Sequence, residues 1–195
     1  MDGFDIEPIA RHSPTSIDDQ PSDAAVLVPI IDRPDGPALL FTKRAEHLGE
    51  HPGQMSFPGG GVEPEDDTLR DTALREAHEE IGLDPAAPTV IGRLDDISTI
   101  TGYAVTPFVA RVPDREYEPD DGEVAEIVVI SLSELLDPAT YTTEVHDHPI
   151  EGPTIIHYFH VGEYTVWGAT ARILVQFLDL GTDFQPTTDV DRVDE

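Results

Sequence analysis

The chain has 195 residues, no cysteine, and a formal net charge of −29 from 40 acidic and 11 basic residues. This length suits one domain with a substantial core, and the lack of cysteine excludes disulfide and thiolate chemistry. Because binding to a nucleic-acid backbone relies on clustered Lys and Arg, the charge argues against nucleic acid as the main partner.

The N-terminal residues predict neither secretion nor membrane insertion. The segment MDGFDIEPIARHSPTSIDDQPSD lacks both a basic start and an apolar run, so we expect no signal peptide. No later stretch approaches the roughly 20 apolar residues that a membrane span needs. We therefore expect a soluble cytoplasmic protein without a membrane partner, in which residues 1–22 form a loosely attached arm.

Extended segments separated by turns follow the arm. The runs AAVLVPII from Ala24 and ALLFTKR from Ala38 are apolar and branched enough for strands, and the turn DRPDGP between them favours a hairpin. The loop AEHLGEHPGQ then leads to MSFPGGG, where three glycines let the backbone approach a ligand closely.

The pattern after the glycines predicts a helix that stops at Gly82. Asp66, Asp67 or Thr68 can cap its start, and glycine is a common residue at the end of a helix. An apolar stripe that includes Ala77 can pack on a sheet.

Three carboxylates share one face of this predicted helix. Each helical residue advances by about 100°, so Glu79 and Glu80 lie about 60° and about 40° to either side of Glu76. Arg75 precedes Glu79 by one turn and can hold that carboxylate. Like charges at this spacing repel by roughly 0.2–0.5 kcal/mol per pair, a cost that a divalent cation would reverse. The alternative interpretation is an acidic surface face.

The second half of the chain combines strands with two helices. The expected strands are TVIGRLDDIS, YAVTPFVAR, EIVVISL, TYTTEV and PTIIHYFHV, and the expected helices are SLSELL and GATARILVQFLDL. Residues 181–195 are expected to fray as a flexible acidic tail. The pattern indicates an α/β domain over residues 23–180, with helices on both faces of a mixed sheet.

Seven residues around the predicted helix have the spacing of a known motif. They are Gly61, Asp67, Arg75, Glu76, Glu79, Glu80 and Gly82. The segment resembles the Nudix box, in which the second of these positions is glutamate. Asp67 has a shorter reach, and Asp66 beside it can share its role. The resemblance implies a Nudix-type α/β/α sandwich and hydrolysis of a diphosphate that links a nucleoside to another group.

Three further segments are similar to the coenzyme A diphosphatase branch of that family. They are LLFTKRAEHLGEHPGQMSFPGG, STITGYAVTPFVA and YTVWGATARIL, and Gly49 and Glu50 depart from the basic residues that bacterial members tend to carry. This resemblance implies cleavage of coenzyme A or acyl-CoA to phosphopantetheine and adenosine 3′,5′-bisphosphate. The alternatives are ADP-ribose or another nucleoside diphosphate derivative, and a non-catalytic nucleotide-binding Nudix module.

The expected cofactor is Mg²⁺ or Mn²⁺, because oxygen ligands and substrate phosphates suit such ions. The expected metal ligands are Glu76, Glu79 and Glu80, and Arg75 is expected to orient them. A general base must lie within hydrogen-bond reach of the attacking water. Glu79 and Glu123 are candidates, as is Glu126, and the sequence does not choose among them. For Glu123 and Glu126, a solvated acidic loop is the alternative that the sequence favours.

We expect the phosphates to be bound just before the predicted helix. The candidate residues are Lys43, Arg44, His51, Gly59, Gly60 and Gly61, and Lys43 is the only lysine of the chain. Each cation taken singly is equally compatible with a surface role. The expected partner is a small-molecule nucleotide, coenzyme A first among them, and a homodimer is left open.

The net charge predicts that stability depends on salt. Repulsion among acidic side chains destabilises the fold in dilute buffer, whereas at about 1 M salt the Debye length falls to roughly 3 Å. We therefore expect a halophilic protein whose melting temperature rises as KCl increases from tens of millimolar to molar. Calorimetry at several KCl concentrations measures this, and a flat or falling melting temperature would contradict it.

Overall fold

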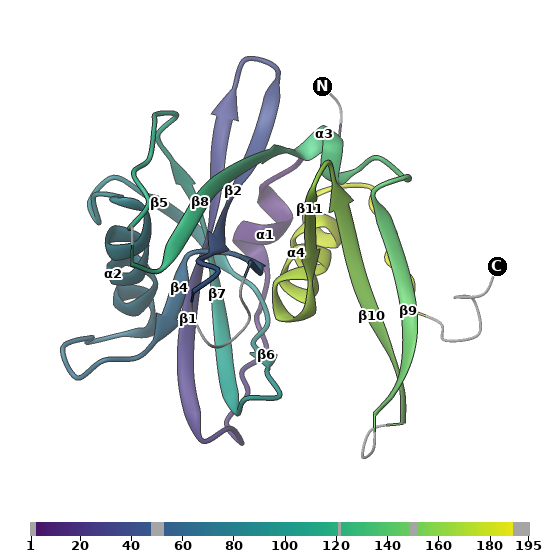
Figure 1. The fold of residues 1–195 in the computed structure, drawn as a ribbon, viewed down its shortest axis with the longest axis horizontal. Coiled ribbons are helices and arrows are strands. Elements are labelled where there is room, and N and C mark those ends of the chain that lie inside the picture. Colours follow the sequence, from purple (N-terminus) through teal and green to yellow (C-terminus); the bar gives the residue numbers. More distant parts are fainter. Residues whose placement is uncertain (1–2, 48–52, 121, 149–151, 189–195) are drawn as a thin grey trace.

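The computed structural model describes residues 3–47, 53–120, 122–148 and 152–188. No helix in these ranges is long and apolar enough to cross a membrane. In chain order (Figure 1) the elements are α1 (Glu7–Arg11), β1 (Ser22–Arg33), β2 (Gly36–Arg44), β3 (Met55–Ser56), β4 (Gly59–Gly61), α2 (Leu69–Ile81), β5 (Thr89–Arg93), β6 (Ile97–Ser98), β7 (Tyr103–Val112), β8 (Val124–Ser131), α3 (Leu132–Leu135), β9 (Tyr141–His148), β10 (Gly152–Val161), β11 (Tyr164–Trp167) and α4 (Gly168–Gly181).

A mixed sheet occupies the centre of the molecule. Its strands follow the order β3-β2-β1-β7-β5, with β4 paired to β1, β6 to β7 and β8 to β2. β1 and β7 are parallel in a register that runs from Ser22 opposite Tyr103 to Ile31 opposite Val112. The other strand pairs of this sheet are antiparallel.

Helices cover both faces of the mixed sheet (Figure 1). α2 packs on one face, where Ala77 and Ile81 join a buried cluster with Leu27 and Leu40. α1 and α4 lie on the other face, where Phe177 belongs to the larger core cluster. The predicted α/β/α sandwich is therefore confirmed.

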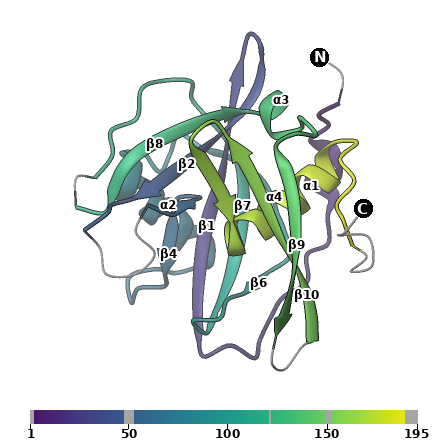
Figure 2. The same ribbon diagram turned by 45° about the vertical axis from the view of Figure 1, so that its right-hand side comes forward.

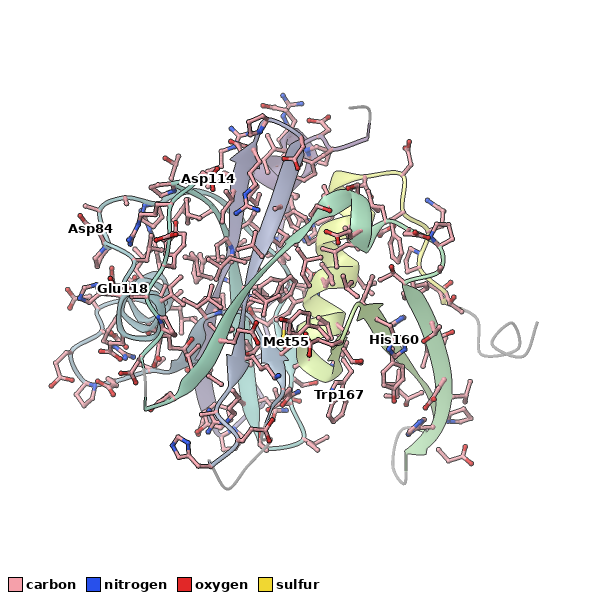
Figure 3. All side chains as sticks on the ribbon, turned by 45° about the horizontal axis from the view of Figure 1, so that its top comes forward. Met55, Asp84, Asp114, Glu118, His160 and Trp167 are labelled. Atoms are coloured by element: carbon pink, nitrogen blue, oxygen red, sulfur yellow. The ribbon has the colours of Figure 1, made fainter. Side chains whose placement is uncertain are left out.

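A second, three-stranded antiparallel sheet has the order β11-β10-β9. It lies beside α4, as the turned view in Figure 2 shows. His160 belongs to this sheet and lies far from α2 in Figure 3. The short strand β11 was not expected from the sequence, and the predicted strand TVIGRLDDIS is divided into β5 and β6.

The N-terminal arm packs onto the domain. Ile9 of α1 is fully buried, and the ring of Phe4 stacks on Phe177 with 5.5 Å between centroids. The Thr15 N–H donates to the Asp95 carboxylate at 2.7 Å. The described residues of the arm are thus part of the packed fold, in contrast to the loose attachment expected. The sequence does not predict this packing because two separate apolar side chains, Phe4 and Ile9, and hydrogen bonds to Asp95 hold the arm, and these contacts form no periodic pattern.

Part of the C-terminal tail is also packed. Phe184 meets the Tyr141 ring edge-on with 5.0 Å between centroids, and the Thr187 N–H donates to the Tyr141 hydroxyl at 3.1 Å. These contacts oppose fraying of residues 182–187. The remainder of the predicted flexible tail, residues 189–195, lies outside the described residues.

Acidic side chains are distributed over the surface. Asp84 follows α2, while Asp114 and Glu118 belong to the segment between β7 and β8, and all three are exposed. They project outward around α2 in Figure 3. The acidic residues are thus carried by ordered loops as well as by the predicted tail.

Truncating Ile9 tests whether the arm belongs to the folded unit. Ile9→Ala should lower the free energy of unfolding by about 2–5 kcal/mol, because it leaves a cavity in the core. Ile100→Ala is the matched control, since Ile100 is 92% exposed, and it should change that free energy by less than about 0.5 kcal/mol. Denaturant titration measures both, and equally small effects would show that the arm is loosely attached.

Candidate active site

The candidate active site lies where β4 meets the carboxylate face of α2. A Cβ atom on Gly60 would lie 2.4 Å from Oε1 of Glu76, and one on Gly59 would lie 2.4 Å from the Ala25 carbonyl oxygen of β1. Neither position has room for a side chain. The glycines are required because β4 fits between β1 and α2.

Both ends of α2 are capped by local hydrogen bonds. At the start, the Thr68 hydroxyl accepts the Asp71 N–H at 3.2 Å, so Thr68 is the cap among the three candidates. At the end, Gly82 adopts a left-handed conformation with φ of 63°, and its N–H donates to the His78 carbonyl. These caps fix the length of α2 and the direction of its carboxylates.

Arg75 organises the acidic groups. Its Nε donates to Asp66 at 3.0 Å, and its Nη2 donates to Asp66 and to the Gly61 carbonyl at 3.0 Å each. Its Nη1 donates to Glu76 at 3.0 Å and to Glu79 at 3.1 Å. The predicted contact between Arg75 and Glu79 is therefore confirmed, and it is one of several.

Asp66, and not Asp67, is the acidic partner of Arg75 before the helix. The Asp66 side chain is 4% exposed and also accepts the Thr72 hydroxyl and the Glu63 N–H, each at 2.9 Å. The hydrogen bonds from Arg75 lower the pKa of Asp66 to about 2. Asp67 is exposed. Counting along the motif points to Asp67, but the turn before α2 directs the preceding carboxylate inward.

The surroundings of Glu80 and Glu76 raise the pKa of both carboxyl groups. Burial, followed by repulsion from Glu76, raises the pKa of Glu80 to about 8, although the Gly59 N–H donates to it at 3.3 Å. Burial also raises the pKa of Glu76, against the opposing charge of Arg75. Glu123 adds to the repulsion at both carboxylates. The arrangement disfavours the ionised forms of both carboxylates, and a bound cation would favour them.

These groups line a pocket of about 570 Å³, which we call the acidic pocket. Its lining residues are Arg44, Gly59, Gly60, Gly61, Glu63, Glu76, Glu79, Glu80, Asp120 and Glu123. Arg44 is the cation on this wall, and its charge partly opposes the rise in the pKa of Glu80 that burial causes. Seven predicted residues are thus brought together with Arg75: three glycines, Arg44 and the three helix glutamates.

Glu123 also lines the acidic pocket, which supports its place among the candidate bases. The backbone N–H of Asp120 donates to the Glu80 carbonyl oxygen at 2.9 Å, and this bond attaches the loop that carries Glu123 to α2. Asp120 and Glu63 were not singled out from the sequence. No local pattern marks them, because their place at the pocket depends on contacts between distant segments.

Lys43 and Glu126 lie apart from the acidic pocket. The Lys43 ammonium is 5.8 Å from the centroid of the Tyr164 ring, and the Tyr164 hydroxyl donates to Glu126 at 2.6 Å. Adjacent strand residues point to opposite faces of a sheet, so Arg44 and Lys43 diverge. His51, the remaining predicted phosphate ligand, lies outside the described residues.

The oxygen-rich lining of the acidic pocket fits a divalent cation that binds in part to substrate phosphates. Among the described residues, no three acidic, His or Cys side chains form a ready-made ligand set. The reason is that Arg75 holds Glu76 and Glu79, while the Gly59 N–H holds Glu80. Mg²⁺ often binds through one or two carboxylates together with substrate phosphates and water, which this arrangement allows.

Asp66→Asn tests the role of the buried carboxylate. It should lower the free energy of unfolding at pH 7 by about 1.5–3 kcal/mol, the usual contribution of hydrogen bonds to charged groups. Because the folded-state pKa of Asp66 is depressed to about 2, its contribution is present above about pH 4 and lost as pH falls through about 2. The difference from wild type in denaturant titration should shrink over that range.

Asp67→Asn is the matched control, because Asp67 is exposed and carries the same charge. It should change the free energy of unfolding by less than about 0.5 kcal/mol. A larger loss of unfolding free energy for Asp67→Asn than for Asp66→Asn would instead identify Asp67 as the acidic residue that supports Arg75.

Comparison with known proteins agrees with this geometry. The NUDIX domain family model matches residues 21–151. The chain is 42% identical over 157 residues to "Uncharacterized Nudix hydrolase NudL" of Enterobacter sp. (strain 638), covering 77% of this chain and 78% of that protein. The protein of the same name from Yersinia pestis (strain Pestoides F) is 42% identical over 155 residues, covering 77% and 75% of the two chains.

Solved structures show the same fold. The Nudix hydrolase RenU of M. smegmatis aligns with a TM-score of 0.50 and 25% identity over 60% of this chain and 74% of that one. The MutT/nudix family protein from Enterococcus faecalis aligns with a TM-score of 0.53 and 17% identity over 84% and 63%. The chain therefore belongs to the Nudix family of hydrolases, which act on the diphosphate bonds of nucleoside diphosphate derivatives and generally use divalent metal ions.

Proposed function

We propose that this Nudix hydrolase cleaves coenzyme A or acyl-CoA into phosphopantetheine and adenosine 3′,5′-bisphosphate. The observation that carries the proposal is the segment of residues 39–60, which is similar to the coenzyme A diphosphatase branch. In the fold the described part of this segment contributes most of β2, all of β3 and the start of β4, and it supplies Arg44, Gly59 and Gly60 to the acidic pocket. The segment that suggests the substrate thus lies at the proposed site of reaction.

The reaction is the attack of water on one phosphorus of the diphosphate. A new P–O bond forms, the anhydride P–O bond breaks, and the other phosphate leaves with the bonding electron pair. The proton of the attacking water passes to a general base. Glu79, which Arg75 holds, and Glu123, which faces Glu76 and Glu80, are the two candidates that line the acidic pocket.

The site residues divide between metal binding and positioning. Glu76 and Glu80, joined by Glu79, would hold a divalent cation, which when bound neutralises phosphate charge and makes the attacking water more acidic. Arg75 positions Glu76 and Glu79, and the glycines of β4 let the Glu76 carboxylate lie against that strand. Arg44 offsets the repulsion between the acidic wall and an anionic substrate.

A substrate screen tests the choice of coenzyme A. Purified protein is incubated in high salt with Mg²⁺ or Mn²⁺ and coenzyme A, ADP-ribose, NADH or an oxidised nucleotide, and the products are separated by chromatography. We expect phosphopantetheine and adenosine 3′,5′-bisphosphate from coenzyme A. Rapid turnover of ADP-ribose without turnover of coenzyme A would overturn the proposal, and binding without any turnover would favour the non-catalytic module.

Substitutions on α2 test the proposed mechanism. Glu79→Gln and Glu80→Gln should each lower kcat by about 10²–10⁴, because each removes a charge needed for metal binding or proton transfer. Glu126→Gln is the matched control, since Glu126 contacts Tyr164 outside the acidic pocket, and its kcat should stay within about twofold of wild type. Unchanged turnover in both α2 variants would refute the mechanism.

The identity of the base requires one further comparison. Glu79→Gln and Glu123→Gln are assayed for kcat over a range of pH. The variant that lacks the base should lose the rise of kcat with pH that reports its deprotonation. The other variant should keep the rise of kcat with pH, and its maximal kcat should be equal to or lower than that of wild type.

A further inference from the structure

The short strand β4 has the acidic pocket on one face and a different surface on the other. β1 lies between β4 and β7 (Figure 1), since Ala24 is opposite both Gly61 and Val105. Successive residues of a strand point to opposite faces of the sheet. Gly60 therefore faces Glu76 and the acidic pocket, whereas Gly61 faces the side that carries α4.

The ring of Tyr103 lies against Gly61 on that second face. A Cβ atom on Gly61 would lie 3.9 Å from Cε1 of Tyr103, and the Tyr103 side chain reaches this position from β7 across β1. A Cβ atom on Gly60 would instead meet the Glu76 carboxylate. An aromatic ring and a carboxylate of the site are thus separated by the backbone of β4 alone.

A cavity of about 220 Å³ lies beside this ring, and we call it the tyrosine shelf. Its described lining residues are uncharged: Ala24, Val26, Gly59, Gly60, Gly61, Thr99, Tyr103 and Val105. The three glycines also line the acidic pocket, so the two cavities adjoin along the backbone of β4.

Exposed apolar side chains gather around the tyrosine shelf. Tyr103 is 38% exposed, and Val62 and Ile100, which adjoin β4 and the turn before β7, are 45% and 92% exposed. The other exposed large apolar side chains among the described residues, Val145 and Trp167, belong to the second sheet. In a chain with 40 acidic residues, an uncharged apolar surface next to the acidic pocket indicates contact with an apolar part of a ligand.

The turn before β7 holds Tyr103 in place. The Tyr103 N–H donates to the Thr99 hydroxyl at 3.0 Å, and the Thr99 N–H donates to the Tyr103 carbonyl oxygen at 2.9 Å. Gly102 takes the left-handed φ of 85° that this turn requires. These bonds fix the backbone of Tyr103, while its ring keeps an exposed surface.

A nucleobase matches the chemistry of the tyrosine shelf. Substrates of the family are nucleoside diphosphate derivatives, in which a ribose joins the base to the diphosphate. Bases are planar and uncharged at neutral pH, and stacking on an aromatic side chain is favourable for each of them. The pantetheine arm of coenzyme A has no aromatic ring and would gain less from Tyr103.

We propose that Tyr103 stacks on the nucleobase of the substrate, which lies on the tyrosine shelf while the diphosphate lies in the acidic pocket. The proposal rests on the proposed function in that the substrate carries a base, and it does not require the substrate to be coenzyme A. Tyr103 contacts the base and not the reacting atoms, so it governs KM rather than kcat.

Kinetics of Tyr103 variants test the stacking contact. Tyr103→Ala should raise KM for coenzyme A by at least about fivefold, the lower end of the effect of removing a stacking side chain, with kcat within about twofold of wild type. Tyr103→Phe keeps the ring and should stay within about twofold in both constants. Tyr158→Ala is the matched control, because the Tyr158 hydroxyl donates to Glu144 in the second sheet, and it should leave both constants unchanged.

Calorimetric binding of AMP and of ribose 5-phosphate with Mg²⁺ gives a readout independent of turnover, because ribose 5-phosphate lacks the base. Wild type should bind AMP more tightly, and Tyr103→Ala should bind the two with similar affinity. Tyr103→Leu keeps apolar bulk on the strand and should also lose AMP affinity, so poor folding of the alanine variant would not decide the result.

Equal affinities of wild type for AMP and ribose 5-phosphate would overturn the proposal, as would unchanged AMP affinity in the alanine and leucine variants. A rise of KM for coenzyme A without loss of AMP affinity would assign the tyrosine shelf to the pantetheine arm and overturn it too. Absence of coenzyme A turnover alone would instead reject the proposed function. The AMP data would then still decide the assignment of Tyr103.

Discussion

The geometry of the site depends on the guanidinium of Arg75. One planar group joins the turn before α2, through Gly61 and Asp66, to the helix itself, through Glu76 and Glu79. An ammonium group could not replace it, because a lysine lacks the fixed fork of donors that meets carboxylates and a carbonyl in one plane. β4 and α2 are thereby held together at the point where the glycines allow the two elements to approach closely.

The same interaction explains why the site tolerates so much negative charge. Hydrogen bonds from Arg75 depress the pKa of Asp66. Its Nη1 is shared between Glu76 and Glu79, and Glu80 is not among the carboxylates to which Arg75 donates. Glu80 keeps its elevated pKa because it is buried near Glu76 with a single backbone donor. Charge that is desolvated and only partly paired costs stability, and it persists in proteins where it serves a ligand.

The sequence predicts the parts of this structure that depend on local periodicity. The position of α2, its stop at Gly82, its apolar stripe and the mixed sheet all follow from residue spacing. Features that depend on contacts between distant segments could not be predicted from residue spacing. Which of Lys43 and Arg44 lines the acidic pocket depends on the face of β2 that meets α2, and the turn geometry selects Asp66 over its neighbour. The arm that carries Ile9 has no period to detect.

The position of Arg44 on the wall of the acidic pocket has a consequence for recognition at high ionic strength. When the screening length is roughly the size of an atom, a charged surface no longer attracts or repels a substrate at a distance. Encounter then proceeds as if the molecule were nearly neutral, and selection among anions falls to groups that touch them. Arg44, which lines the acidic pocket, would retain its effect under these conditions, whereas a diffuse basic surface would lose it.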